Sequence, residues 1–152
     1  MIMNAYMYNI ELQCLLVYSN YTVKIKPAEQ HCVADEFSEI KGILETWSDK
    51  KNIDLILTVD VTPEVTKAII DREAPHLASR MILGCCEKSK FSVLSRSVCG
   101  MCGQSLILNL PSSVKGSTEC FDMIASVLPH ALDQLKGRTK RVASLHTEIQ
   151  KN

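Results

Sequence analysis

The order of apolar and polar residues along the chain predicts an alternation of strands and helices. Asp54 to Thr58 is a short apolar run, typical of a strand buried on both faces. Two segments, 36–49 and 63–74, space their apolar residues along one face of a helix. Further strands are expected at FSVLS and SLILNLP, and further helices at 76–86 and along the apolar face of 120–135. This alternation predicts an α/β fold in three layers, with a doubly wound, mostly parallel sheet.

Proline and short polar residues mark the expected helix ends. Asp35 is placed to cap the helix at 36–49. Thr62 is the expected N-cap of the next helix, Pro63 its first residue and Pro75 its stop, because proline preorganises a helix start but cannot continue a helix. Pro129 is expected to break or kink the apolar face of 120–135.

The N-terminal pattern predicts a hairpin. The sequences CLLVY, at 14–18, and YTVKI, at 21–25, resemble two strands around a turn at Ser19 and Asn20. A parallel crossover takes a dozen or more residues, and only about ten separate CLLVY from the strand expected near 30–33. We therefore expect an antiparallel hairpin in place of a parallel first unit.

Length and charge set limits on the class of protein. A chain of 152 residues fits one core, and we expect a domain at 33–137, an atypical N-terminal segment at 1–32 and a polar tail at 138–152. The 17 basic and 17 acidic side chains leave no net field for nucleic acid. Asn9 and Glu11 interrupt the first apolar run, and no positive leader precedes it, so neither a signal peptide nor membrane insertion is expected. The expected location is cytoplasmic.

Seven cysteines form an odd set, which favours reduced thiols over structural disulfides. The sequence CGMC places Cys99 and Cys102 at a spacing used by redox dithiols and by halves of zinc sites. The residues after it resemble a strand, whereas a reactive dithiol begins a helix, and no second pair stands at ligand spacing. We interpret CGMC as a glycine-rich turn, with a dithiol redox protein as an alternative.

The connection between Thr58 and Pro63 is the first place to expect a ligand, because sites in α/β proteins lie beyond the carboxyl ends of strands. Asp60 stands there and also suits a helix N-terminus, as Asp35 does. Lys115 and Ser117 begin a later helix and can either meet an anion or face solvent in a capped turn.

Five motifs occur in one order between Val33 and Leu135: DVTPE, REAP, LSR, NLP and KGS-ECF. Together they resemble the molybdopterin adenylyltransferase (MoaB/Mog) domain family, and most closely its gephyrin-type members. The resemblance implies a doubly wound α/β domain that assembles as a homotrimer. It also implies transfer of AMP from Mg²⁺-bound ATP to the phosphate of molybdopterin, with release of pyrophosphate.

The resemblance also implies roles for individual residues. The two acids of the family's active site fall on Asp35 and Asp60, with Asp60 acting through Mg²⁺. The substrate-binding residues of the pterin and phosphate pocket fall on Ser95, Arg96, Asn109, Leu110, Pro111, Lys115 and Ser117.

The chain departs from the family where phosphate should be held. Members carry a T-G-G-T-G loop before DVTPE, whereas here Thr58 is followed by Val59 and then Asp60. Glycines in such loops let backbone N–H groups approach phosphate closely. Ser112 also replaces the glycine after NLP, and Cys102 replaces an arginine. These changes predict weak binding of the triphosphate and the pterin phosphate.

Two functions from different classes remain open. One is a molybdopterin adenylyltransferase with impaired activity. The other is a non-catalytic oligomerisation module of the gephyrin type, which in a longer isoform would serve a cytoskeletal or receptor scaffold. An isoform or gene model that lacks pieces of a normal gene accounts for the missing loop and the altered N-terminus.

Overall fold

The structure is a computed structural model that describes residues 2–7, 24–30, 34, 36–51, 53–59 and 63–138. Its strands are β1 (Ile2–Met7), β2 (Lys24–Gln30), β3 (Leu55–Val59), β4 (Arg72–Glu73), β5 (Cys99–Cys102) and β6 (Ser105–Leu110). Its α-helices are α2 (Phe37–Glu45), α3 (Pro63–Ile69), α4 (Pro75–Cys86), α5 (Val114–Ile124) and α6 (Leu128–Leu135). A π-helical turn, η2 (Thr46–Lys50), continues α2, and a 3-10 helix, η3 (Lys90–Leu94), follows α4.

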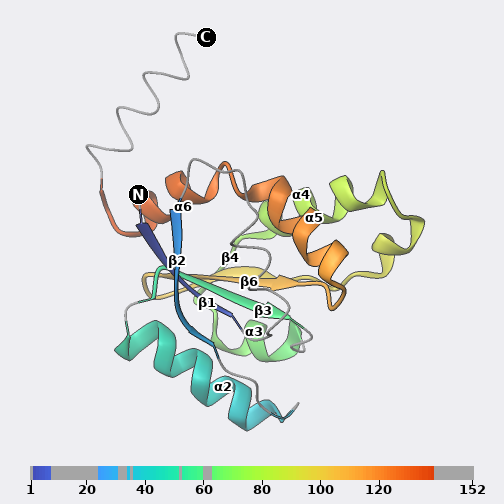
Figure 1. The fold of residues 1–152 in the computed structure, drawn as a ribbon. Coiled ribbons are helices and arrows are strands. Elements are labelled where there is room, and N and C mark those ends of the chain that lie inside the picture. The colour runs from blue at the N-terminus through green and yellow to red at the C-terminus, as the bar shows by residue number, and fades with distance from the viewer. Residues whose placement is uncertain are drawn as a thin grey trace, which may run out of the picture.

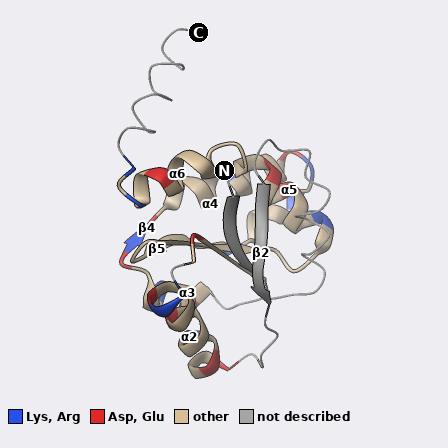
Figure 2. Ribbon diagram, turned by 60° about the vertical axis from the view of Figure 1, so that its left-hand side comes forward, with Lys and Arg blue, Asp and Glu red and all other residues tan. Residues whose placement is uncertain are grey.

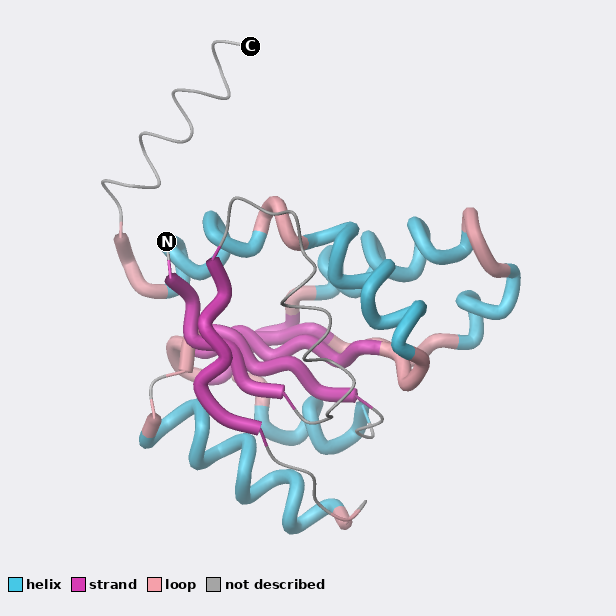
Figure 3. The backbone as a smooth tube through the Cα atoms, viewed as in Figure 1, coloured by secondary structure: helices cyan, strands magenta, loops and turns pink. Residues whose placement is uncertain are grey.

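The six strands form one sheet in the order β2-β1-β3-β6-β5-β4. Strands β2, β1, β3 and β6 are parallel neighbours, while β5 runs antiparallel to both β6 and β4. Figure 3 shows the sheet as a central layer with helices on both sides. The predicted α/β class with a mostly parallel sheet is confirmed.

Two apolar cores lie on opposite faces of the sheet. Helices α4, α5 and α6 cover one face, where Leu57, Leu108 and Phe121 belong to one buried cluster. Helices α2 and α3 cover the other, where Ile56, Ile107 and Trp47 belong to a second cluster (Figure 1). The side chains of β3 and β6 alternate between these clusters, which explains why both strands are apolar throughout.

The N-terminal hairpin prediction is wrong for the described residues. Lys24 and Ile25, placed in its second arm, begin β2 and pair in parallel with Ile2 and Met3 of β1. The predicted first arm, 14–18, lies outside the described residues. The connection from β1 to β2 covers residues 8–23, which is long enough for a parallel crossover. The prediction failed because it began the first strand too late in the chain.

The predicted helix at 63–74 is too long. It ends as α3 at Ile69, and β4 follows before α4 begins at Pro75. The backbone N–H of Asp71 donates to Met101 O, and that of Ala74 donates to Cys99 O, both at 2.8 Å. Pairing with β5 therefore takes over the hydrogen bonds that a longer helix would make. The helix at 76–86 is confirmed as α4.

Two local predictions around β5 are also wrong. FSVLS is not a strand, because 3-10 hydrogen bonds such as Ser95 N–H to Ser92 O form η3. CGMC is not a turn but the whole of β5, and the turn to β6 is confined to Gly103 and Gln104. Gly103 has φ +56°, which favours glycine. The SLILNLP strand is confirmed as β6.

The ends of the other helices partly follow the prediction. The helix predicted at 36–49 is α2 with η2, and its N-cap position falls on Glu36. Asp35 and Thr62, the expected caps, lie outside the described residues. The apolar face of 120–135 is divided between α5 and α6, and Pro129 stands in the first turn of α6, so the predicted break is confirmed.

Charged positions of both signs share the same helices, as on α3 and α5 in Figure 2. Within the described ranges, no helix is long and apolar enough to cross a membrane.

Candidate ligand groove

The carboxyl ends of β3 and β6 lie side by side, because Val59 pairs with Leu110. At this edge β6 continues through residues 111–113 into α5, and α3 begins at Pro63, four residues after the end of β3. Ligands of parallel α/β proteins bind at such an edge. The predicted site residues at 109–117 belong to the end of β6, to residues 111–113 and to the start of α5.

Asn109 joins three elements beneath this edge. It is 4% exposed, and its Nδ2 donates to Thr58 Oγ1 of β3 and, at 2.9 Å, to Thr66 Oγ1 of α3. Its Oδ1 is buried without a hydrogen-bond partner. The side chain therefore holds α3 against the sheet. Leu110, the next predicted residue, is also buried and contributes to the core.

A groove of about 620 Å³ lies next to this edge, between α4, η3 and α5. Its size is that of ordinary small-molecule sites. Hydroxyls and lysines dominate its polar lining, with one carboxylate: Lys88, Ser89, Ser92, Ser95, Ser112, Ser113, Lys115 and Glu119. Of the predicted substrate-binding residues, Ser95, Pro111 and Lys115 line it.

The N-terminus of α5 forms one end of the groove. Ser113 is the N-cap, and its Oγ accepts a hydrogen bond from the Gly116 N–H at 3.1 Å. Ser117 Oγ donates to Pro111 O, which ties the connection to the first turn of the helix. Positive partial charge at a helix N-terminus, together with Lys115, suits an anionic ligand. Glu119 offsets part of the positive charge, because its carboxylate also lines the groove and pairs with Lys88 at 3.4 Å.

Ser95 and Arg96, adjacent in sequence, face different cavities. Ser95 lines the groove and lies 3.1 Å, Oγ to Oγ, from Ser97. Arg96 lines a second cavity of about 450 Å³ beside α3, where its Nη1 pairs with Glu64 Oε1 at 2.7 Å. Both partners are more than half exposed, so this pair adds little stability.

The two predicted acids, Asp35 and Asp60, lie outside the described residues. Among the described residues, no group of three or more His, Cys, Asp or Glu side chains is arranged to hold a metal ion.

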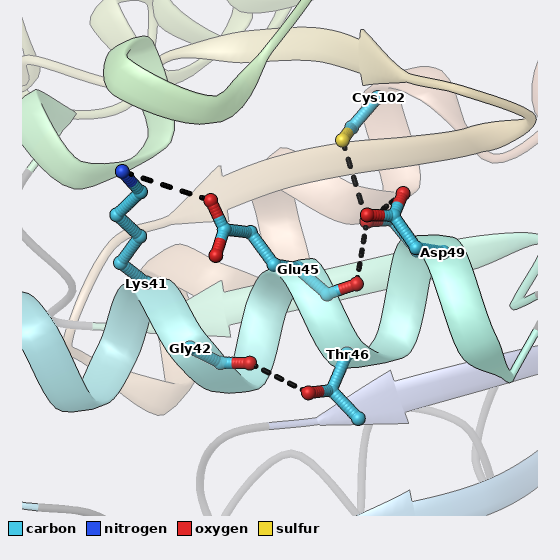
Figure 4. A network of polar contacts seen from close by, with 7 residues as sticks. Lys41, Gly42, Glu45, Thr46, Asp49 and Cys102 are labelled. Atoms are coloured by element: carbon cyan, nitrogen blue, oxygen red, sulfur yellow. Dashed lines mark hydrogen bonds and ion pairs between the residues drawn. The ribbon is translucent and has the colours of Figure 1, made fainter.

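The dithiol interpretation of Cys99 and Cys102 is wrong. In strand β5 their side chains point to opposite faces of the sheet, because Cys99 belongs to the core under α4 and α5 and Cys102 to the core over α2. Burial raises the pKa of the Cys99 thiol to about 12 and also raises that of Cys102. Cys102 Sγ donates to Ser48 Oγ at 3.3 Å, beside the π-helical turn in Figure 4. Neither a shared disulfide nor a shared zinc ion can form across the sheet.

Sequence reasoning missed the α4 and η3 wall of the groove. Ile82, Cys85, Lys88 and Ser89 carry no motif, and they reach the groove only because α4 packs on α5. Cys120 belongs to the ECF motif, but its sequence position alone does not place it in the groove, which it lines only because α5 packs on α4.

Several curated proteins are similar in sequence. The molybdenum cofactor synthesis protein cinnamon of Drosophila melanogaster is 36% identical over 126 residues, which cover 78% of this chain. A molybdopterin adenylyltransferase of Helicobacter pylori strain J99 is 30% identical over 128 residues, covering 78% of this chain and 73% of the enzyme. Gephyrin of Dictyostelium discoideum is 30% identical over 71% of this chain. The chain spans only 21% of cinnamon and 16% of gephyrin.

Solved structures agree with these sequence relatives. The molybdopterin biosynthesis enzyme MoaB of Thermus thermophilus superposes with a TM-score of 0.75 at 33% identity, over 90% of this chain and 96% of MoaB. The Mog protein of Mycobacterium ulcerans gives 0.74 at 31%, over 90% and 99%. No protein-family profile matches the chain. With its order of motifs, its sheet and these relatives, the chain belongs to the MoaB/Mog family of molybdenum cofactor biosynthesis proteins.

Proposed function

We propose that the chain binds molybdopterin in the groove at the N-terminus of α5 and has only weak adenylyltransferase activity. The full reaction is transfer of AMP from ATP to the pterin phosphate, with release of pyrophosphate. One observation carries the proposal: the first turn of α5, with Ser113, Lys115 and Gly116, borders a groove of ligand size beside the carboxyl ends of β3 and β6.

The groove has the chemistry to hold the pterin phosphate. The Lys115 ammonium supplies positive charge, and the Ser95 and Ser112 hydroxyls supply donors from two sides. Ser113 caps the helix, so the helix start remains ordered beside the phosphate. Asn109 acts indirectly, because it fixes α3 and β3 at the edge where the two substrates would meet.

The nucleotide half of the site fits less well. Only residues 60–62 separate β3 from α3, and none of the six glycines lies between 54 and 63. A backbone cradle for a triphosphate needs successive N–H groups that glycine allows to approach the oxygens. Asp60 is the proposed Mg²⁺ ligand, with Asp35 as the second active-site acid. When bound, Mg²⁺ would neutralise phosphate charge. We therefore expect ATP to be held poorly even with both acids present.

The test compares AMP transfer by this protein with that by the Helicobacter pylori enzyme under identical conditions. We expect a rate more than about a hundredfold lower, because positioning supplies most of the catalysis in phosphoryl-type transfer. A rate within tenfold of that enzyme would contradict the impairment.

Molybdopterin binding is tested separately, by fluorescence titration with Lys115→Ala. Loss of one charge-assisted contact should weaken binding by about tenfold. Lys50→Ala is the matched control, because Lys50 is exposed on η2, away from the groove, and this variant should bind normally. If Lys115→Ala binds molybdopterin with unchanged affinity, the pterin phosphate does not bind in this groove.

The second candidate function, a non-catalytic oligomerisation module, is supported by four large apolar side chains exposed on α4 and η3. They are Leu83, Phe91, Val93 and Leu94, each at least 67% exposed. We propose that further copies of this chain cover them in a homotrimer, as the family resemblance implies. We also propose that the protein is cytoplasmic and that a longer isoform serves as a scaffold. Analytical ultracentrifugation tests it: Leu94→Glu should shift a trimer toward monomer, and a monomeric unmodified chain would exclude it.

A further inference from the structure

A pair of buried cysteines lies where α4 packs against α5. Cys85 Sγ and Cys120 Sγ are 3.0 Å apart, and the two residues are only 5% and 4% exposed. Both are free thiols, and both line the groove. Neither is among the residues proposed to hold the pterin phosphate.

Close packing of the two helices brings these thiols together. A Cβ at Gly84, next to Cys85, would lie 2.6 Å from Met123 Sδ on α5. The glycine therefore leaves room for the Met123 side chain against α4, and a larger residue there would displace that flexible side chain. The packing of α4 on α5 therefore sets the distance between the two sulfurs.

We propose that Cys85 and Cys120 are a modification site, at which a peroxide-class oxidant forms a reversible disulfide between α4 and α5. A disulfide bond is about 2.05 Å long, so the two sulfurs have to approach by roughly 1 Å, which small side-chain rotations supply.

The reaction balances with hydrogen peroxide as the oxidant. One thiolate attacks the peroxide and becomes a sulfenic acid, with loss of water after proton transfer. The second thiol attacks the sulfenic sulfur, forms the S–S bond and releases a second water. Two thiols lose two electrons and two protons in total, and the peroxide is reduced to two waters.

Access sets the rate of this reaction. The groove is the route for a small oxidant, because both cysteines line it. Burial raises the pKa of Cys120, and its contact with Cys85 raises it further, so little thiolate is present at neutral pH. The disulfide therefore forms slowly and reports sustained oxidation. Once formed, it fixes the spacing of the two helices that carry Ile82 and Lys115 in the groove wall.

Peptide mapping tests the proposal without altering the core. Cys86→Ser is the starting protein, since Cys86 would share a tryptic peptide with Cys85. After incubation with hydrogen peroxide, free thiols are alkylated and the protein is digested. We expect peptide 81–88 joined to peptide 116–136, with a mass lower than their sum by two hydrogens. Methionine oxidation adds oxygen and is distinguished by mass.

Thermal unfolding gives an independent measurement. The cross-link closes a loop of 35 residues, and it should raise Tm by about 5–10 °C until a reductant removes it. Cys120→Ser should abolish the shift. Alkylation of Cys85 and Cys120 in all of the oxidised, folded protein would overturn the proposal, and so would a disulfide from Cys120 to Cys99. If Cys120→Ser fails to fold, the peptide map of Cys86→Ser decides alone.

Discussion

The two thiols of β5 differ in what surrounds them. Cys99 is 2% exposed in the core beneath α4 and α5, beside apolar side chains such as Leu108 and Phe121. Cys102, on the opposite face, has the Ser48 hydroxyl as a hydrogen-bond partner. A buried hydroxyl without a partner costs free energy, whereas one that finds a partner costs little. The same substitution should therefore act differently at the two positions.

We expect Cys99→Ser to lower the free energy of unfolding by about 1–3 kcal/mol, because its new hydroxyl meets an apolar core in which the neighbouring Asn109 N–H already donates to Val98 O. Cys102→Ser should cost less than about 1 kcal/mol, because Ser48 can bond the new hydroxyl. Urea unfolding of both variants measures the difference. Equal losses of unfolding free energy would contradict the placement of the two thiols in different environments on opposite faces of the sheet.

Among the elements, the close packing of the end of α3 on β5 depends on Gly100. A Cβ at Gly100 would lie 2.6 Å from Ile70 Cδ1 and 2.9 Å from Ile70 Cβ. The Ile70 Cβ is held by the backbone after α3, so it cannot simply swing away as a side-chain tip can. The glycine therefore lets the end of α3 pack closely on β5.

We expect Gly100→Ala to destabilise the protein by about 1–3 kcal/mol through overpacking. Gly42→Ala is the matched control, since Gly42 is exposed in α2 and a Cβ there meets nothing within 4 Å. That variant should gain about 0.5–1 kcal/mol from helix propensity. Thermal unfolding compares the pair, and a Gly100→Ala protein as stable as the parent would show that α3 and β5 do not pack so closely.

Elements with a strong period were predictable, and short ones were not. The apolar runs of β3 and β6 and the helix at 76–86 were predicted because many residues agree on one pattern. The sequence CGMC predicts a turn because glycine is rare in strands, whereas its pairing with Ile107 and Leu108 of β6 makes it a strand. The apolar residues of FSVLS suggested burial, but Phe91 is 69% exposed.

In the whole molecule, the groove also has one part that the sequence predicts and one part that only the packing of distant elements creates. Its half at the start of α5 was predictable, because the connection after β6 and the helix start are continuous in sequence. Its other half was not, because Ile82 and Ser92 reach the groove only through the packing of α4 and η3. The parallel pairing of β1 with β2 likewise depends on partners distant in sequence.

We infer that this chain keeps the family fold but lacks the backbone cradle for the nucleotide phosphates. Insertion of a T-G-G-T-G loop between Val59 and Asp60 tests it, and it should cost little stability because loop-closure entropy grows slowly with length. Isothermal titration calorimetry with ATP and Mg²⁺ then compares the two proteins. We expect measurable, Mg²⁺-dependent ATP binding only with the inserted loop. Equal affinity of both proteins for ATP would show that the missing loop is not what prevents nucleotide binding.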